Sequence, residues 1–203
     1  MRWKDVIVQK CLAAWNIPPA KREEWVRADA IVTQAVSWMR DGGAGPGNWL
    51  LAGAVRKVQE DIRNISGKML PVIPQEEVWM ADQYLPNVVG VAGGTLGKTS
   101  SVKRNTYSVA KFQAGICRQF GFDTIVVVTF DLHMRRAMET YRLFGLEPLA
   151  GPVVDKNYTH RNFIHWGMRT RWRAFCREFI LRHISLVLVR YLQWRDRKKG
   201  EEQ

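Results

Sequence analysis

Cysteine is scarce in this chain of 203 residues, and its placement excludes two kinds of site. The three cysteines, Cys11, Cys117 and Cys176, are odd in number, far apart and in no CxxC pair. This pattern argues against a disulfide framework and against a cysteine-based zinc centre. Reduced thiols are typical of a cytoplasmic protein, and we expect that location.

Long apolar runs are lacking as well. The longest stretch near the carboxyl end, ISLVLVRYL at 184–192, is too short to span a bilayer and contains Arg190. The amino-terminal residues have no small-residue cleavage site after an apolar core, so we expect no signal peptide. Glycine and proline (16 and 8 residues) show no period, which excludes a collagen-like chain. With 46% hydrophobic and 25% charged residues, the composition is that of a globular protein.

Acidic residues are outnumbered, 19 against 31 basic ones, which gives a net charge of +12. Residues 156–199 hold 12 basic and 2 acidic side chains, so the rest of the chain is close to neutral. This segment is also rich in tryptophan and in apolar residues, which favours a helix packed on the domain with its arginine stems reaching outwards. A peripheral membrane contact is an alternative, and nucleic-acid binding is the least favoured one.

Apolar segments of strand length alternate with segments of helical period. The strands are expected at 28–36, 70–74, 87–94 and 123–130, and the helices at 49–65, 76–84, 106–121 and 134–145. Because the strands are apolar throughout, we predict a three-layer Rossmann-like α/β domain with a mainly parallel sheet over 28–160. An N-terminal helical segment, 1–27, would precede it, and a basic C-terminal helical segment, 161–203, would pack on it.

Ligands of such folds bind at the carboxyl ends of the strands, and one candidate site follows the strongest strand. His133 and Arg136 lie three residues apart at the opening of a helix, in TFDLHMRRA (129–137). An arginine there can bind phosphate or carboxylate, and a histidine can transfer a proton. The alternative is a solvated helix start with a surface histidine and arginine.

Two other loops carry candidate residues. VAGGTLGKTS (91–100) partly matches the phosphate-binding P-loop, with Lys98 and Thr99 in place but Ala92 where the first glycine belongs. Its alternative is a glycine-rich turn with an exposed lysine. In PQEEVW (74–79), Glu76 and Glu77 could orient a ligand or a metal or act as a base, or they could simply complement the helix dipole.

The residues of 104–149 together resemble the YdcF/SanA/ElyC-like family of bacterial proteins. The resemblance rests on an N-T helix start, an apolar strand ending in V-T, and an H-x-x-R-A motif, matched by Asn105, Thr106, Ala110, Thr129, His133, Arg136 and Ala137. The family's first strand and D-G loop resemble 28–32 with Asp41 and Gly42, and a family glutamate is matched by Glu178. The chain departs from the family where Gln34 and its neighbours replace glycines, where Val109 replaces an asparagine, and where Glu76 and Glu77 are the nearest counterparts of an acidic motif.

The resemblance implies a Rossmann-like sheet with a polar pocket and an anionic or nucleotide-like ligand, S-adenosylmethionine or a phosphorylated metabolite among the candidates. We expect His133 and Glu77 to be catalytic and assign no metal ligand. The expected ligand-binding residues are Gln34, Asp41, Glu76, Lys98, Asn105, Thr106, Thr129 and Arg136. Two other functions remain open: a P-loop hydrolase or kinase that binds a nucleotide with Mg²⁺, and a non-enzymatic adaptor that uses the basic C-terminal segment.

Overall fold

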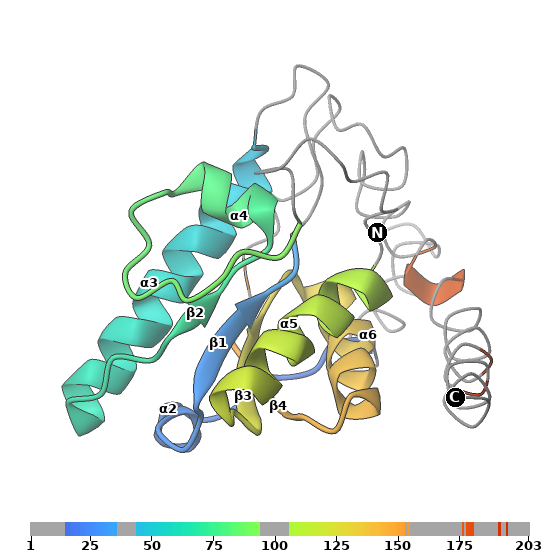
Figure 1. Cartoon of the computed structure of the whole chain (residues 1–203). Coiled ribbons are helices and arrows are strands. Elements are labelled where there is room, and N and C mark those ends of the chain that lie inside the picture. Colours follow the sequence, from blue (N-terminus) through green and yellow to red (C-terminus); the bar gives the residue numbers. More distant parts are fainter. Residues whose placement is uncertain are drawn as a thin grey trace.

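A computed structural model of the chain describes residues 15–35, 44–93, 106–152, 154, 176, 178–180, 191 and 194. In this part of the chain, parallel strands form a sheet in the order β2-β1-β3-β4, with helices on both faces (Figure 1). The strands are β1 (Ala30–Thr33), β2 (Val72–Ile73), β3 (Thr124–Val128) and β4 (Glu147–Ala150). The predicted α/β class with a parallel sheet is confirmed.

The central strands β1 and β3 are buried on both faces, which is why their sequences are continuously apolar. All four residues of β1 are buried, as are the last four of β3. Their register pairs Ala30 with Ile125 and Thr33 with Val128. Three of the five residues of β3 are valine, whose branched side chain packs well on a pleated surface.

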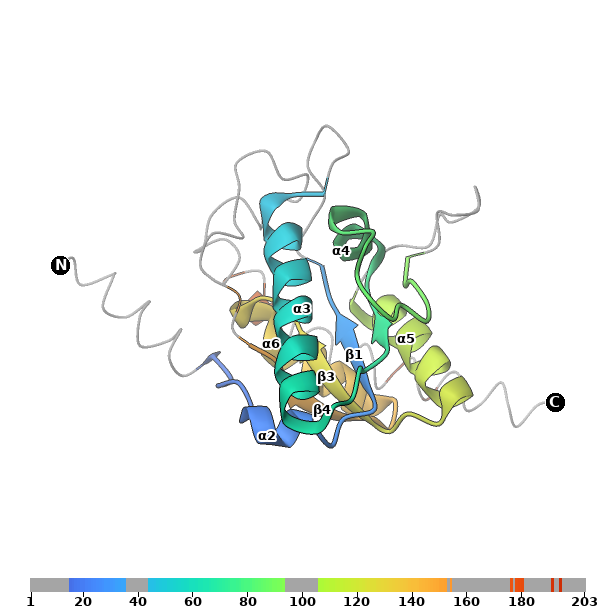
Figure 2. The same cartoon turned by 90° about the vertical axis from the view of Figure 1, so that its left-hand side faces the viewer.

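Successive side chains of these strands point to opposite faces and build two cores. Ile31 and Val126 pack with α3 (Pro46–Ser66), and Ala30 and Ile125 pack with α5 (Thr106–Phe120) and α6 (Asp131–Leu143). The short helices α2 (Arg22–Trp25) and α4 (Glu76–Ala81) join α3 on its side. Figure 2 shows α3 in front of the sheet and α5 to its right, beyond β1. The result is the three-layer order predicted from the sequence.

Two tryptophans of the amino-terminal segment tie it to this domain. The indole N–H of Trp15 donates to the Leu132 carbonyl at 2.7 Å, and that of Trp25 donates to the Ala150 carbonyl at 3.0 Å. Both rings belong to the core that packs under α3. Residues 15–27 therefore pack as part of the α/β domain.

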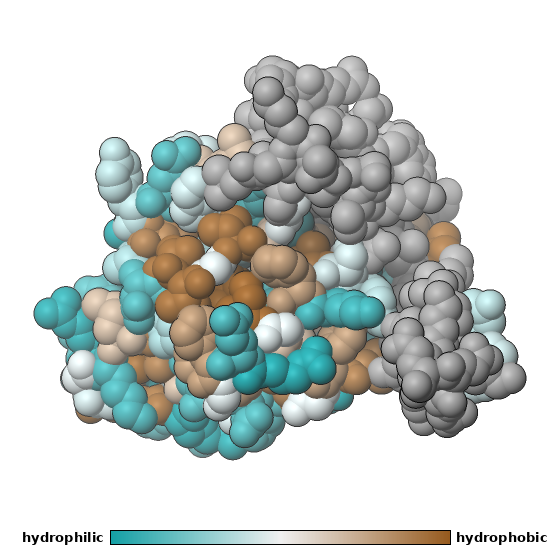
Figure 3. Space-filling view, in the orientation of Figure 1, coloured by the Kyte–Doolittle hydropathy of each residue, from teal (hydrophilic) through white to brown (hydrophobic). Residues whose placement is uncertain are grey.

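The segment expected as a strand over 87–94 forms only isolated bridges, Val72 with Val88 and Gln75 with Ala92. Asn87 has a φ of 55°, in the left-handed region, so the chain is not extended where this segment starts. Because Val72 also pairs with Ile31, the segment extends the sheet beyond β2 as an edge. Hydrophobic side chains gather over it in Figure 3.

The expected C-terminal helical segment is described at a few positions only. Residues 176, 178–180, 191 and 194 are helical. The rest of 161–203 lies outside the described residues. Within the described part of the chain, no helix is both long and apolar enough to cross a membrane.

Candidate functional site

The candidate site lies where the chain changes direction across the sheet. From β1 the chain runs to β2 on one side, and it later returns to β3 on the other side of β1. At such a switch point the connections leave in opposite directions and open a crevice at the carboxyl ends of the two strands. The predicted residues Gln34 and Thr129 come directly after β1 and β3. They are buried, and the Thr129 hydroxyl donates to the Gln34 carbonyl at 2.9 Å.

His133 sits in the first turn of α6, which begins at Asp131, three residues before the predicted start at 134. Its ring is 3% exposed and stacks on Phe130, with the ring centroids 5.3 Å apart. Nδ1 lies 3.0 Å from Oε2 of Glu178, and Nε2 lies 3.4 Å from both Oε1 of Gln34 and Oγ1 of Thr106. The alternative of a surface histidine at a solvated helix start is wrong.

Arg136 lies one turn further along α6 and holds the same carboxylate. Its Nε donates to Oε2 of Glu178 at 2.7 Å and its Nη2 donates to Oε1 at 3.0 Å, while Nη1 donates to the Thr106 hydroxyl. Such a two-pronged contact is the strongest pairing that arginine makes with a carboxylate. Arg136 is only 7% exposed, so the surface alternative is wrong for this residue too.

Glu178 is completely buried and comes from a segment far along the chain. Burial raises the pKa of this carboxyl, but the charges of His133 and Arg136 and their hydrogen bonds outweigh burial and hold the pKa well below its ordinary value. The glutamate is therefore ionised at neutral pH. Only the resemblance noted in the sequence pointed to it, and the structure places it at the centre of the cluster.

Two buried polar residues of the neighbouring helices extend the cluster, and sequence reasoning missed both. The Gln34 amide nitrogen donates to the Tyr141 hydroxyl at 3.0 Å, and that hydroxyl donates to Oε1 of Gln113 at 2.5 Å. Burial raises the pKa of Tyr141 well above its ordinary value, so its hydroxyl is neutral. The available signal was a glutamine within the apolar face of α5, between Val109 and Cys117 at the helical spacing of four.

The acidic pair after β2 lies at the same edge of the sheet. The end of β2 is tied to the end of β1, because the Gln75 N–H donates to the Thr33 hydroxyl at 2.9 Å and the Ala35 N–H donates to Oε1 of Gln75 at 2.8 Å. Glu76 and Glu77 follow and are 5% and 3% exposed. Both lie in the first turn of α4, so the alternative that they complement the helix dipole stays open beside a role at the site.

Three predicted ligand-binding residues, Asp41, Lys98 and Asn105, lie outside the described residues, as does Thr99 of the P-loop-like stretch. Ala92, near the start of that stretch, is hydrogen-bonded to the chain that follows β2. The Ala92 N–H donates to the Pro74 carbonyl, and the Ala92 carbonyl accepts from the Glu76 N–H, each at 2.8 Å. The backbone N–H at the first-glycine position of the pattern therefore points into the sheet.

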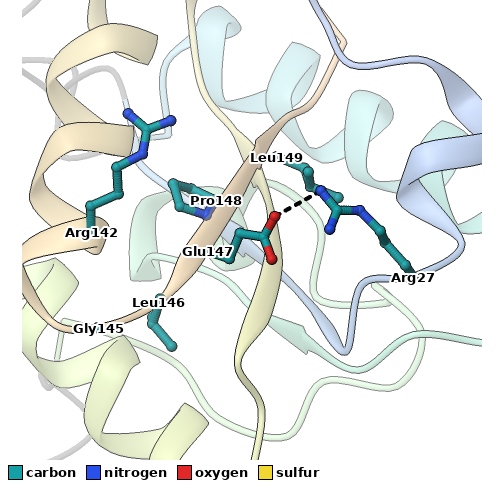
Figure 4. A pocket seen from close by; sticks show the side chains of 7 residues that line it. All are labelled: Arg27, Arg142, Gly145, Leu146, Glu147, Pro148 and Leu149. Carbon is teal, nitrogen blue, oxygen red and sulfur yellow. Dashed lines mark ion pairs between the residues drawn. The ribbon is translucent and has the colours of Figure 1, made fainter.

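A separate hollow of about 540 Å³ lies at the other end of β4 (Figure 4). Arg27 and Arg142 border it, and Arg27 pairs with Glu147 at 2.8 Å. All three of these side chains are exposed, unlike those at the switch point. Among the described residues, no three His, Cys, Asp or Glu side chains are placed to hold a metal ion.

Comparison of the chain with protein families, with curated proteins and with solved structures finds no match. The functional argument therefore depends on the geometry of the switch point. There the structure brings together Gln34, Thr106, Thr129, His133 and Arg136 of the predicted set, and adds Glu178.

Proposed function

We propose that this protein binds an anionic or nucleotide-like small molecule at the carboxyl ends of β1 and β3, and that it is an enzyme in which His133 transfers a proton. S-adenosylmethionine and phosphorylated metabolites are the ligand candidates, as the resemblance to the YdcF/SanA/ElyC-like family implies. The observation that carries the proposal is the buried His133–Glu178 pair at the topological switch point.

A carboxylate on Nδ1 is what a proton-transferring histidine needs. Glu178 holds the ring of His133 in one orientation and stabilises the protonated form. Nε2 lies 3.4 Å from Oε1 of Gln34 and from Oγ1 of Thr106, a looser contact than the 3.0 Å on the Glu178 side. We propose that a ligand oxygen contacts this nitrogen, since hydrogen bonds of catalytic groups commonly tighten only when the ligand is bound.

Two features of this cluster favour the binding of an anionic ligand. The helix α6 begins at this place, at Asp131, and the amino end of a helix attracts negative charge. Arg136 uses three of its five N–H groups on Glu178 and Thr106, which leaves one N–H on each terminal nitrogen for a ligand. The guanidinium thus serves both to position Glu178 and to meet the ligand.

A thermal-shift screen against nucleotides, S-adenosylmethionine, sugar phosphates and divalent ions tests the proposal, because a ligand stabilises the folded state that binds it. At 100 times its Kd, a ligand adds about 2.7 kcal/mol of stability. The wild type is compared with His133→Gln, and each shift is measured from that variant's own ligand-free melting temperature. We expect at least one anionic compound to stabilise the wild type and to lose most of that effect in the variant.

Equal shifts in the wild type and in His133→Gln would remove His133 from the site. Glu147→Gln is the matched control, because it removes an exposed carboxylate at the opposite end of the sheet. This control variant should respond to every ligand as the wild type does. If no anionic compound stabilises the wild type, the proposed function is wrong.

A further inference from the structure

The orientation of the buried side-chain amides in the cluster follows from their hydrogen bonds, beginning with those of Gln113 to backbone carbonyls. Nε2 of Gln113 donates to the carbonyls of Thr33 and Ile73, at 3.0 and 2.7 Å. An amide nitrogen has two hydrogens, so both are used, and Oε1 of Gln113 is left as an acceptor. The Tyr141 hydroxyl, which contacts this oxygen, must therefore donate its one hydrogen to it.

The same reasoning orients Gln34. Because the Tyr141 hydroxyl gives its hydrogen to Gln113, it accepts one from the Gln34 amide nitrogen, 3.0 Å away. Turning the Gln34 amide over would set its oxygen against a hydroxyl that has no hydrogen left to give. Oε1 of Gln34 is thereby presented to Nε2 of His133.

Both ring nitrogens of His133 consequently face acceptors. Nδ1 meets the ionised carboxylate of Glu178, and Nε2 meets Oε1 of Gln34. The Thr106 hydroxyl, 3.4 Å from Nε2, accepts a hydrogen bond from Arg136 and keeps its own hydrogen, so it can either donate to Nε2 or accept from it. A neutral imidazole with its hydrogen on Nδ1 would place the Nε2 lone pair against the lone pairs of Oε1 of Gln34.

We propose that the Gln113–Tyr141–Gln34 relay holds His133 as an imidazolium, and that its Nε2–H is the donor to an oxyanion of the ligand, of phosphate or carboxylate type. Gln34, Tyr141 and Gln113 are then positioning residues. The donor role rests on the proposed function, whereas the protonation of His133 does not.

The charges of the cluster agree with an oxyanion. Arg136 and an imidazolium both attract a negative ligand, and Glu178 pairs with the two of them. Arg136 opposes protonation of His133 and Glu178 favours it. Around the ring, β1 and α5 present the neutral Gln34 and Thr106, and Tyr141 behind Gln34 is neutral as well.

Nitrogen-15 NMR of the labelled full chain reads the protonation of each histidine. The chain has four histidines, and the His133 signals are identified by their loss in His133→Gln. At pH 8 an ordinary histidine, with a pKa of about 6.5, is neutral. We expect both His133 nitrogens to give signals of protonated nitrogen at this pH. One protonated and one unprotonated nitrogen would overturn the inference, whatever the protein binds.

Tyr141→Phe tests the relay itself. Without the hydroxyl, the Gln34 amide is free to turn its nitrogen towards His133, which disfavours the second proton. We expect the proton affinity of His133 to fall by roughly tenfold, the effect of one hydrogen bond to a charged group. The matched control is Tyr107→Phe, which removes a hydroxyl from a half-buried ring of α5 that packs on Phe144. An unchanged titration in Tyr141→Phe, or an equal change in both variants, would overturn the relay.

Inorganic phosphate and adenosine 5′-monophosphate are the probes of the donor role. Each should move the Nε2 signal of His133 in the wild type, and by less in Tyr141→Phe. If both probes bind and leave that signal unchanged, the donor role is wrong although the proposed function stands. If neither probe nor any compound of the thermal-shift screen binds, the proposed function fails, and the donor role fails with it. The imidazolium and the relay are then judged on the pH titration alone.

Discussion

Replacement of Glu178 by glutamine tests the central contact of the cluster. The wild-type carboxylate is fully buried and accepts hydrogen bonds from His133 and, twice, from Arg136, at 2.7 to 3.0 Å. Glutamine has nearly the same shape, but it has no charge and brings an N–H₂ group towards donors. The substitution therefore leaves a buried guanidinium without its counter-ion and creates no cavity.

The expected loss is large for a single substitution. Removing one partner of a buried ion pair costs about 3–5 kcal/mol, because the remaining charge stays desolvated. A domain of this size is stable by roughly 5–15 kcal/mol and shifts its Tm by roughly 2–4 °C per kcal/mol. We expect Glu178→Gln to lower the Tm by roughly 6–20 °C and to remove a substantial part of the free energy of unfolding.

Urea denaturation at pH 7, followed by far-UV circular dichroism, measures this loss. Glu147→Gln is the control, because Glu147 also pairs with an arginine at 2.8 Å but both side chains are about half exposed, 55% and 52%. An exposed pair contributes about 0–1 kcal/mol. If the two variants lose the same free energy, the Glu178 carboxylate does not hold a buried charge pair and the reasoning fails.

The stability of the wild type and that of Glu178→Gln should also respond differently to acid. Burial raises the pKa of Glu178, but His133 and Arg136 outweigh burial and hold it well below the ordinary 4.5. A carboxylate with a depressed pKa stabilises the fold fully above its unfolded pKa, and this stabilisation is lost as the pH falls through the folded pKa. The deficit of Glu178→Gln should shrink as the pH falls below 4.5, because the wild type then loses this stabilisation and the variant has none to lose. A deficit that grows below pH 4.5 would contradict this assignment.

Three further predictions concern packing and reactivity. Gly151→Ala should cost roughly 1–3 kcal/mol in urea denaturation, because its Cβ would lie 2.6 Å from a carbonyl oxygen of β3. Gly53→Ala, whose Cβ meets no described atom within 4 Å in α3, should instead stabilise by about 1 kcal/mol. Trp25→Ala should cost about 3–5 kcal/mol by thermal denaturation, whereas Trp49→Ala, at a ring 59% exposed, should cost little. Cys117 is buried and its thiol pKa is raised to about 11, so a disulfide reagent should label it only after unfolding.

The alternation of strands and helices could be predicted because the strands that matter most are buried on both faces. The continuous apolar run at 123–130 can belong only to a strand covered on two sides, and β3 occupies Thr124–Val128. The run at 87–94 is also largely apolar but contains three glycines, and its described residues form only isolated bridges at the edge of the sheet. Glycine weakens a strand, so the apolar pattern alone did not predict how much of this segment pairs.

Part of the site could be predicted because strand ends in a parallel sheet meet at one edge. This rule brought His133, Thr129 and Gln34 together from the sequence alone. The rule says nothing about Tyr141 and Gln113, which enter through the buried faces of α6 and α5. In a sequence each is a single polar residue within an apolar stripe, and only the packing of the two helices shows that they touch.

Glu178 couples the assembly of the site to the packing of a distant segment. The carboxylate lies 42 residues beyond Arg136 in the chain and is fully buried against it. Burying either charge alone is costly, so the residues around 178 and the first turns of α6 stabilise each other only when they are packed together. The segment that packs Glu178 is thus part of the site, although the α/β core places His133 and Arg136 without it. The proposed oxyanion, bound to Arg136 beside Glu178, would strengthen this coupling, because a ligand stabilises the packed state that binds it.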